Sequence, residues 1–385
     1  MKRQLAIGLL WHSDRSGNLG VGALTIGHMA LVHQAAELAG VQPLFHLFQP
    51  ADQGQSYVGD ADAVRHFITG RYMASPGGYW RDLRGIDLML DIGAGDSFAD
   101  IYPDKRFAYI IATKQLCLWR GIPLVLAPQT IGPFTRQPHR ALAAHIMRRA
   151  RAVFARDSLS FDAIRSIAPK ARAHQAIDVA FALPWQPITR QPGTRVGINV
   201  SGLLYAGGYG GRNDYGMTVD YAEFNSRLIA ELLQRGATVE LIAHVTSPVA
   251  RDDDLTAARS LHARFPETVL VPAFPSPSAA KSHISGLDFV VAGRMHASIA
   301  AWSAGVPVLP VSYSRKFEGL YGTLNYPWLI PAQGMTTDDA IARAIAAFDA
   351  RDSIRAEIAR LQPAVSAKLQ SYVDYLAGLL TELAQ

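Results

Sequence analysis

Cysteine is almost missing from this 385-residue sequence, which contains only Cys117. One cysteine cannot form an internal disulfide or a cysteine-based metal site, so both of these structural classes are excluded. A single thiol fits a protein that works in a reducing cytosol. Residues 252–254 are three adjacent aspartates that resemble a metal cluster, but acids that lead into a helix usually complement its dipole. We therefore expect no metal site.

Strong charge and long apolar runs are also missing. The net charge of +5 and the pI of about 9.3 fall well short of a nucleic-acid-binding arm, but suit an enzyme for anionic small molecules. The opening MKRQLAIGLLW imitates a signal peptide, yet its short apolar run meets residues 12–15 without a cleavage site. We interpret it as the first strand, and no other segment reads as a bilayer span. We expect a cytoplasmic enzyme with no nucleic-acid partner, whose membrane contact would be peripheral at the inner face.

The sequence does contain a repeated alternation of strand and helix patterns, which is typical of an α/β fold. The alternation stops at a proline-rich linker around residues 184–192 and restarts at Arg195. This predicts two Rossmann-like domains facing a cleft that is lined by the carboxyl edges of both sheets. We expect an N-terminal domain at 1–184, a C-terminal domain at 193–335, and helices at 336–385 that pack on the domains and break near Pro363.

Three features follow strands of the predicted first domain. Residues 16–22, which include Asn18, form a glycine-rich turn that can bring backbone amides to a ligand. This turn is not a strict dinucleotide fingerprint and has no clear acidic ribose partner, which disfavours a dehydrogenase. Gly95 and Asp96 follow another strand. Asp96 is either a functional residue at the carboxyl end of this strand or the cap of a helix or turn. Arg156 is a cation at a strand end that either binds an anion or pairs with an acid.

Residues 286–316 of the predicted second domain read as strand, turn, helix and strand. Arg294 and His296 fall at the carboxyl end of the first strand, and Lys316 follows the second. Three potential cations around a helix N-terminus make an anion site plausible. The alternative is that Arg294 pairs with a carboxylate while His296 caps the helix. Earlier in this domain, Ser201-Gly202 opens a glycine-rich, tyrosine-bearing loop that we expect to be mobile and to cover a ligand.

The order of these motifs resembles the polysaccharide pyruvyl transferase family from the first strand to about Tyr326. The most specific block is Arg-x-His with a downstream Tyr-x-x-Lys, which the sequence carries as Arg294, His296, Tyr313 and Lys316. Two departures accompany the resemblance. The first turn of the family commonly reads Asn-x-Gly-Asp, whereas this sequence has no aspartate there, and the family's triple glycine is Gly-Ala-Gly at residues 93–95. The other matching segments are the turn at 18–22 with its helix, DLMLDIGAGDSF, LAPQTIGPF, VFARDSLS and IDVAFAL.

The resemblance implies a GT-B-like fold with the acceptor on the N-terminal side and the donor on the C-terminal side. It implies transfer of a pyruvyl group from phosphoenolpyruvate (PEP) onto sugar hydroxyls of a cell-surface glycan or its lipid-linked precursor, with no metal or organic cofactor. In this reading Arg294 holds the carboxylate or phosphate, His296 exchanges a proton, and Lys316 neutralises the phosphate. Asp96 orients or deprotonates an acceptor hydroxyl, and Arg156 holds the anionic end of either substrate. The remaining expected substrate-binding residues are Asn18, Gly95, Ser201, Gly202 and Tyr313.

Two other classes of protein compete with this reading. A GT-B glycosyltransferase would share the fold and the cation-lined site but use a nucleotide sugar. No acidic residue is clearly placed to hold a ribose, which favours the pyruvyl transferase. A non-catalytic binding module of an envelope assembly complex is the third class. Such a module would have no need to retain Arg294, His296 and Lys316 together. The sequence predicts no oligomeric state.

Overall fold

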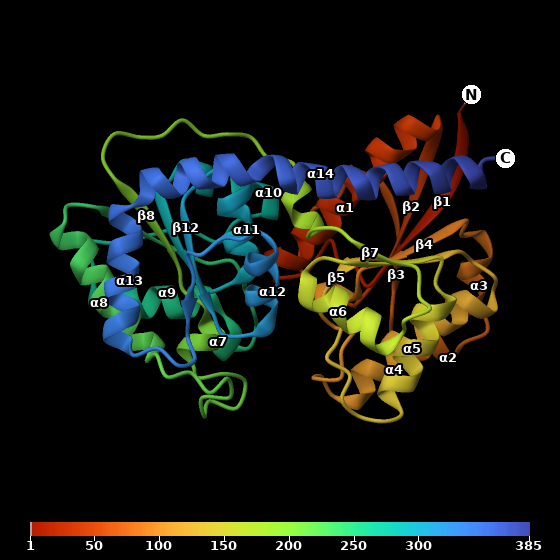
Figure 1. Cartoon of the computed structure of the whole chain (residues 1–385), viewed down its shortest axis with the longest axis horizontal. Helices are drawn as coiled ribbons and strands as arrows, with labels where there is room; N and C mark the ends of the chain where they lie inside the picture. Colours follow the sequence, from red (N-terminus) through yellow and green to blue (C-terminus); the bar gives the residue numbers. More distant parts are fainter. Residues whose placement is uncertain (1) are drawn as a thin grey trace. The chain divides into compact units, whose positions relative to one another are not determined.

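Two compact units make up the computed structural model, which describes residues 2–385 (Figure 1). Each unit contains one parallel sheet with helices packed against it, so the expected α/β class with two Rossmann-like domains is confirmed. Unit 1 consists of the chain up to Ser16, Leu24–Leu183 and Val365–Gln385, and unit 2 of Gly17–Ala23 and Pro184–Ala364.

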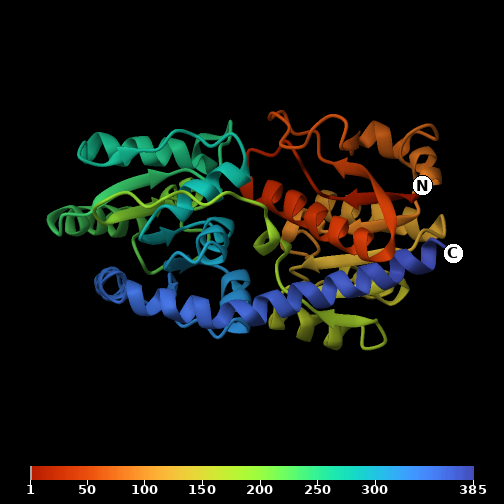
Figure 2. The same ribbon diagram turned by 90° about the horizontal axis from the view of Figure 1, so that it is seen from above.

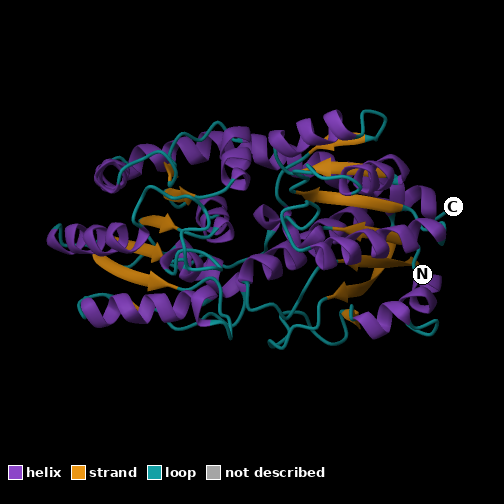
Figure 3. Ribbon diagram, turned by 90° about the horizontal axis from the view of Figure 1, so that it is seen from below, coloured by secondary structure: helices purple, strands orange, loops and turns teal. Residues whose placement is uncertain are grey.

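The sheet of unit 1 has seven parallel strands in the order β3-β2-β1-β4-β5-β6-β7, and helices lie on both of its faces (Figures 2 and 3). Its strands are β1 (Arg3–Leu10), β2 (Val41–Gln49), β3 (Ala63–Phe67), β4 (Leu88–Asp91), β5 (Leu124–Gln129), β6 (Ala152–Ala155) and β7 (Ala173–Gln175). Its helices are α1 (Leu19–Ala39, beginning in unit 2), α2 (Gly70–Ala74), α3 (Tyr79–Asp82), α4 (Asp104–Trp119), α5 (His139–Arg149) and α6 (Ser158–Ile167).

The sheet of unit 2 repeats the same winding with six strands in the order β10-β9-β8-β11-β12-β13. Its strands are β8 (Arg195–Asn199), β9 (Thr238–Ile242), β10 (Val269–Leu270), β11 (Phe289–Ala292), β12 (Val308–Ser312) and β13 (Ile330–Pro331). Its helices are α7 (Gly202–Tyr205), α8 (Tyr221–Gln234), α9 (Asp254–Arg264), α10 (Pro277–Ser285), α11 (Met295–Ser303), α12 (Arg315–Thr323) and α13 (Thr337–Asp349), followed by α14 (Arg351–Leu383), which contributes residues to both units.

Three elements differ from the sequence prediction. The polar residues 51–78 have no strand pattern in the sequence, but they contain the edge strand β3. The C-terminal helices were expected to break near Pro363, but the break falls at Ala350 and α14 runs through the proline. Proline removes only one backbone donor from this 33-residue helix, whose packing on both sides of Pro363 stabilises it. The third difference is the assignment of Gly17–Ala23 to unit 2.

A buried chain of polar rings lies inside unit 1. The two ring nitrogens His12 Nε2 and His28 Nδ1 are 2.9 Å apart, and His28 Nε2 is 2.8 Å from the hydroxyl oxygen of Tyr372. All three side chains are fully buried. Burial lowers the pKa of His28 to about 3, and burial followed by the neighbouring His28 lowers the pKa of His12 well below its ordinary value. These histidines are therefore neutral packing residues.

We expect this chain of rings to make the protein sensitive to mild acid. Below pH 6.5 the histidines take up protons in the unfolded chain but not in the folded protein, so stability falls as the pH drops from 6.5 toward 3. The free energy of unfolding should fall by about 1.4 kcal/mol per pH unit for each fully buried histidine. Urea unfolding at pH 7, 6 and 5 measures this slope. His28→Gln should flatten it, whereas His33→Gln, which changes an exposed histidine of the same helix, should leave it unchanged.

Candidate active site

The carboxyl edge of the unit 2 sheet gathers most of the side chains that the sequence singled out. Strands β8, β9, β11 and β12 run parallel and end at this edge. Arg294 follows β11 and is the N-cap residue of α11, and His296 lies in the first turn of that helix. Tyr313 and Lys316 follow β12, which is the neighbour of β11. The topology therefore brings the Arg-x-His and Tyr-x-x-Lys blocks to one place.

Arg294 is held by two carboxylates. Its Nε and Nη2 atoms donate to Asp254 Oδ1 at 3.0 and 2.9 Å, and Nη2 also donates to Asp252 Oδ1 at 2.8 Å. The side chain is 9% exposed, so its charge is compensated almost entirely inside the protein. Burial lowers the pKa of Arg294, but the negative charges around it, Asp254 first among them, outweigh burial and raise the pKa. Arg294 therefore forms ion pairs with carboxylates, which is the alternative that we had left open for this residue.

One edge of the guanidinium remains available. Among the described residues, none accepts a hydrogen bond from Nη1 of Arg294. The exposed aromatic residue Tyr209 and the buried Tyr313 both interact electrostatically with Arg294. Arg294 can therefore still donate to a ligand at this edge, although it does so as part of an ion pair and not as an isolated cation.

Asp254 organises this part of the site, and sequence reasoning missed it. Its Oδ2 atom accepts hydrogen bonds from the backbone N–H groups of His244 and Val245 at 3.1 and 3.0 Å. Its Oδ1 atom accepts from the backbone N–H of Gly202 at 2.9 Å as well as from Arg294. We had interpreted residues 252–254 as acids that complement the dipole of a helix. Asp253 does cap α9, but Asp254 is fully buried and serves the site instead.

Ser201 and Gly202 build the site and leave little surface for a ligand. Both are buried, and Ser201 is the N-cap residue of the short helix α7. The backbone N–H of Ser201 donates a hydrogen bond to the Tyr221 hydroxyl oxygen at 3.1 Å. A Cβ atom on Gly202 would lie 2.4 Å from the carbonyl oxygen of Asp253. Only glycine allows this close approach, and the approach lets the Gly202 N–H reach Asp254.

Residues Gly17–Ala23, which we call the strap, pack on the same sheet edge. Thr246 N donates to Gly17 O at 2.9 Å and Leu19 N donates to His244 O at 3.1 Å, with an antiparallel bridge between Asn18 and Val245. Asn18 Oδ1 accepts from the backbone N–H of Gly20 at 3.0 Å, so the asparagine shapes its own turn. The strap belongs to unit 2 because these contacts tie it to the segment after β9.

Gly20 lies directly against the imidazole of His296. A Cβ atom built on Gly20 would be 2.3 Å from His296 Nδ1 and 2.6 Å from Cγ, closer than real Cβ atoms come. The contact fixes where the ring can lie, because the strap leaves no room for another rotamer on that side. Gly20 thereby positions His296, although the two residues are 276 positions apart in the sequence.

We expect Gly20→Ala to displace the His296 ring and lower kcat about tenfold to a hundredfold, because catalytic groups must be held closely in place. The free energy of unfolding should change by no more than about 2 kcal/mol. The matched control is Gly322→Ala in α12, where the added methyl group meets no atom within 4 Å. Steady-state kinetics and urea unfolding of both variants test this. Equal kcat values for the two variants would contradict it.

His244 is a second histidine at this edge that sequence reasoning did not select. It follows β9, is 2% exposed, and interacts electrostatically with His296 and Arg294. Burial, and then these two neighbours, lowers the pKa of His244 to about 3, so its ring is neutral. The sequence did contain a signal for His244, because it follows a strand and parallel strands end at a common edge of the sheet. That strand, β9, pairs with β8.

Aromatic side chains form a wall beside these charges. The Tyr313 and Tyr215 rings meet edge to face with centroids 4.8 Å apart, and Lys316 Nζ lies 5.7 Å from the Tyr313 ring centroid. Tyr215 and Tyr209 belong to the glycine-rich loop at residues 206–217, in which Gly207, Gly208 and other glycines have positive φ. We predicted that this loop covers a ligand, and that function stays a prediction.

The other predicted site residues lie in unit 1. Asp96 follows β4 and accepts a hydrogen bond from the Tyr102 hydroxyl at 2.8 Å. Gly95 packs beside Arg156, which is 1% exposed and pairs with Asp178 through a 2.6 Å contact. Arg156 therefore pairs with an acid, the second of the two roles we considered, and offers no surface to a ligand in this structure. Its role here is to fasten the loops at the carboxyl edge of the first sheet.

A buried ion pair lies at the end of β4, directly before the turn that carries Asp96. Lys114 Nζ lies 2.8 Å from Asp91 Oδ1, both side chains are fully buried, and Gln129 Nε2 donates to Asp91 O at 2.8 Å. Burial lowers the pKa of Lys114, against the opposing pull of Asp91. In the same turn Ala94 has a φ of 50°, a left-handed conformation that glycine adopts without strain and alanine rarely adopts. The lysine was hidden from sequence reasoning by its place on the apolar face of α4.

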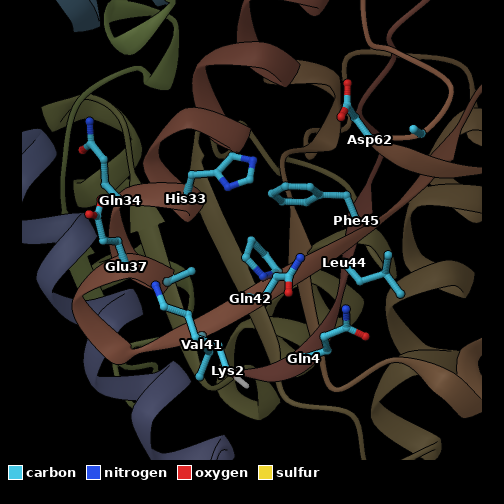
Figure 4. Close-up of a pocket in the computed structure, with 13 residues that line it drawn as sticks. Lys2, Gln4, His33, Gln34, Glu37, Val41, Gln42, Leu44, Phe45 and Asp62 are labelled. Carbon is cyan, nitrogen blue, oxygen red and sulfur yellow. The ribbon is translucent and has the colours of Figure 1, made fainter.

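The described residues 2–385 contain no group of three or more histidine, cysteine, aspartate or glutamate side chains that could hold a metal ion. A hollow of about 1070 Å³ lies at the amino end of the first sheet, where His33, Glu37, Phe45 and Asp62 line it (Figure 4). None of the predicted site residues lines it. One described helix, α1, passes a test of length and apolarity for a membrane span, but 72% of its most apolar stretch is buried in the protein.

The two parallel-sheet units and the strand-end site define a GT-B-like α/β protein. Solved structures with this fold agree with that class. A putative UDP-N-acetylglucosamine 2-epimerase from Listeria monocytogenes is 11% identical, with a TM-score of 0.59 over 92% of this chain and 91% of that one. HepE from Anabaena in complex with UDP-glucose is 13% identical, with a TM-score of 0.57 over 98% and 100%. The epimerase from Methanocaldococcus jannaschii is 9% identical, with a TM-score of 0.57 over 89% and 92%.

The sequence itself gives the family. Residues 56–315, more than half of the chain, match the model of the polysaccharide pyruvyl transferase family. The protein belongs to this family, and the resemblance drawn from its motifs is confirmed. The matched range contains Asp96, Arg156, Arg294, His296 and Tyr313, while Lys316 follows it directly. Family membership supports a transferase that modifies polysaccharides.

Proposed function

We propose that this protein transfers the pyruvyl group of PEP onto two hydroxyls of a sugar, forming a cyclic ketal on a cell-surface glycan or its precursor. The observation that carries the proposal is the gathering of Arg294, His296 and Lys316 at one sheet edge of a chain in this family. A proton donor beside two cations suits an enol that bears a phosphate and a carboxylate. We further propose that the protein works in the cytoplasm, where PEP is made.

The reaction balances with these groups alone. A proton adds to the methylene carbon of PEP and turns it into a methyl group, which leaves an oxocarbenium-like carbon. One sugar hydroxyl attacks this carbon, the bond to the phosphate oxygen breaks, and the second hydroxyl closes the ketal ring. Of the two hydroxyl protons, one replaces the proton given to the methyl group and the other leaves with phosphate. No oxidant or reductant takes part.

His296 is the group we assign to the first proton. Its neighbour His244 has a pKa of about 3 and is neutral, so His244 cannot serve as the acid. Lys316 supplies the charge that the departing phosphate needs, and the Tyr313 ring beneath it limits its positions. Arg294 contributes its open Nη1 edge from within the ion pair with Asp254. In unit 1, Asp96, oriented by Tyr102, is our candidate for binding an acceptor hydroxyl.

The test is a transfer reaction followed by mass spectrometry. Purified protein and PEP are incubated with a mixture of nucleotide sugars, lipid-linked sugars and envelope polysaccharide. The proposal predicts one product with the added mass of a pyruvyl ketal and one phosphate released for each ketal formed. His296→Gln should form neither, and Gly322→Ala should match the wild type. Glycosyl transfer from a nucleotide sugar, with PEP left unused, would contradict the proposal.

A GT-B glycosyltransferase that uses a nucleotide sugar is the second candidate function. HepE, which shares the fold, holds UDP-glucose in its structure. That likeness concerns the fold and does not choose a donor, because the two chains are 13% identical. The transfer experiment separates the two candidates, because a pyruvyl ketal and a transferred sugar add different masses to the product.

A further inference from the structure

Helices α4 and α5 of unit 1 lie next to each other (Figure 1). An apolar groove lies between them at the surface. Its volume is about 500 Å³, and Ala108, Ile111, Leu116 and Trp119 line one side at helical spacing while Leu142 lines the other. Trp119 is 70% exposed and Leu142 is 40% exposed. An amphipathic helix normally buries this stripe, so the α4–α5 groove is an apolar surface that lacks a cover.

The chain segment around the groove has a higher net positive charge than the whole protein. Residues 100–151 contain nine lysines and arginines against two aspartates, a net charge of +7, whereas the whole chain carries +5. Of these cations only Lys114 is buried. Within the described part of the chain, Lys105, Arg140, Arg148 and Arg149 make no ion pair. The groove is therefore an apolar strip with uncompensated positive charge on both of its helices.

We propose that the α4–α5 groove docks on a membrane surface that contains anionic lipids. Trp119 and Leu142 would enter the headgroup region, where an indole ring is favoured because it is apolar with one polar N–H. Lys105, Arg148 and Arg149 would meet the lipid phosphates. The inference goes beyond pyruvyl transfer and does not depend on the donor, although a lipid-linked acceptor would be found at such a surface.

Two other occupants fit the observations less well. Nucleic acid would use the positive charge but has no apolar surface to cover Trp119 and Leu142. A second copy of this chain, placed face to face on the groove, would bring two segments of +7 together. Like charges at an interface oppose association, so the charge favours an anionic lipid surface over the chain itself.

Flotation of the full-length protein with vesicles tests the proposal. We expect binding to phosphatidylcholine vesicles that contain phosphatidylglycerol, and little binding to phosphatidylcholine alone. Removing two cations with Arg148→Ser/Arg149→Ser should lower the partition coefficient about 25-fold, at roughly fivefold for each charge. Trp119→Ser/Leu142→Ser should lower it at least as much. The matched controls are Arg259→Ser/Arg264→Ser on α9 and Leu38→Ser, which changes an exposed leucine of α1.

Fluorescence measures whether Trp119 enters the membrane, and stability measurements show whether the variants are folded. The emission of Trp119, taken as the difference between wild type and Trp119→Phe, should shift to shorter wavelength when anionic vesicles are added. Thermal unfolding and PEP binding of the groove variants should match the wild type, because these side chains are exposed and lie outside the proposed active site. Wild-type protein that ignores anionic vesicles overturns the proposal. So does a Trp119→Ser/Leu142→Ser variant that binds vesicles normally but loses self-association in sedimentation velocity, which would make the groove a contact between copies.

Discussion

Replacing Asp254 by asparagine is expected to lower the free energy of unfolding by about 3–5 kcal/mol and to abolish the proposed transfer. The carboxylate accepts hydrogen bonds from the backbone N–H groups of Gly202, His244 and Val245, as well as from Arg294. An asparagine side chain has the shape of the carboxylate but only one acceptor oxygen, and its NH2 group would face hydrogen-bond donors that the carboxylate now accepts from. At least one buried donor loses its partner, and the buried charge of Arg294 keeps only Asp252.

The neighbouring aspartate provides the matched control for this prediction. Asp253 caps α9 by accepting from Thr256 N at 2.8 Å. Asparagine is also a good N-cap residue, so Asp253→Asn should cost no more than about 1 kcal/mol and leave activity nearly unchanged. Urea unfolding and PEP-dependent phosphate release measure both variants. If Asp254→Asn proves as stable and active as Asp253→Asn, Asp254 does not organise the site in the way the structure indicates.

Replacing His296 by glutamine is expected to lower kcat by about 10²–10⁴-fold while PEP binding and stability stay near those of wild type. The side chain is half-buried at the sheet edge, so removing it leaves no buried charge unpaired. His244 cannot replace it as a proton donor, because burial holds the pKa of His244 at about 3. The loss should therefore appear in the chemical step and hardly in the binding step.

A second histidine of unit 2 controls for the substitution itself. His262 lies on α9 and interacts with the Thr268 hydroxyl across 3.0 Å, away from the sheet edge that carries the site. His262→Gln should keep the wild-type kcat. Steady-state kinetics together with calorimetric PEP titrations separate kcat from binding. A His296→Gln enzyme with wild-type turnover would remove His296 from the mechanism, and a variant that no longer binds PEP would make it a binding residue.

The βαβ pattern was readable from the sequence because buried parallel strands are continuous apolar runs. The pattern around Phe289–Ala292 and Val308–Ser312 placed Arg294 and Lys316 at one edge, as observed. Local chemistry also sufficed to predict that Asp253 complements the dipole of α9. It did not suffice for Asp254, whose partner Arg294 is 40 residues away and reaches it only through the order of the strands.

The strap shows a second limit of reading a sequence locally. The glycine-rich turn after the first strand was assigned to the domain of that strand, because such turns usually serve their own sheet. In the structure Gly17–Ala23 binds the segment after β9 and touches His296. No periodicity or spacing encodes a backbone bridge between Asn18 and Val245. Arg156 presents the same difficulty, since its partner Asp178 is set by the fold.

Calorimetric titration with PEP and with UDP-glucose tests the proposed donor most directly. Arg294→Ala is a poor probe, because it would leave Asp254 buried without its cation. Lys316→Met is better, because it removes the charge and keeps an apolar stem over Tyr313. We predict that wild type binds PEP, that Lys316→Met binds it about tenfold to a hundredfold more weakly, and that UDP-glucose gives no heat. Binding of UDP-glucose without binding of PEP would contradict the account.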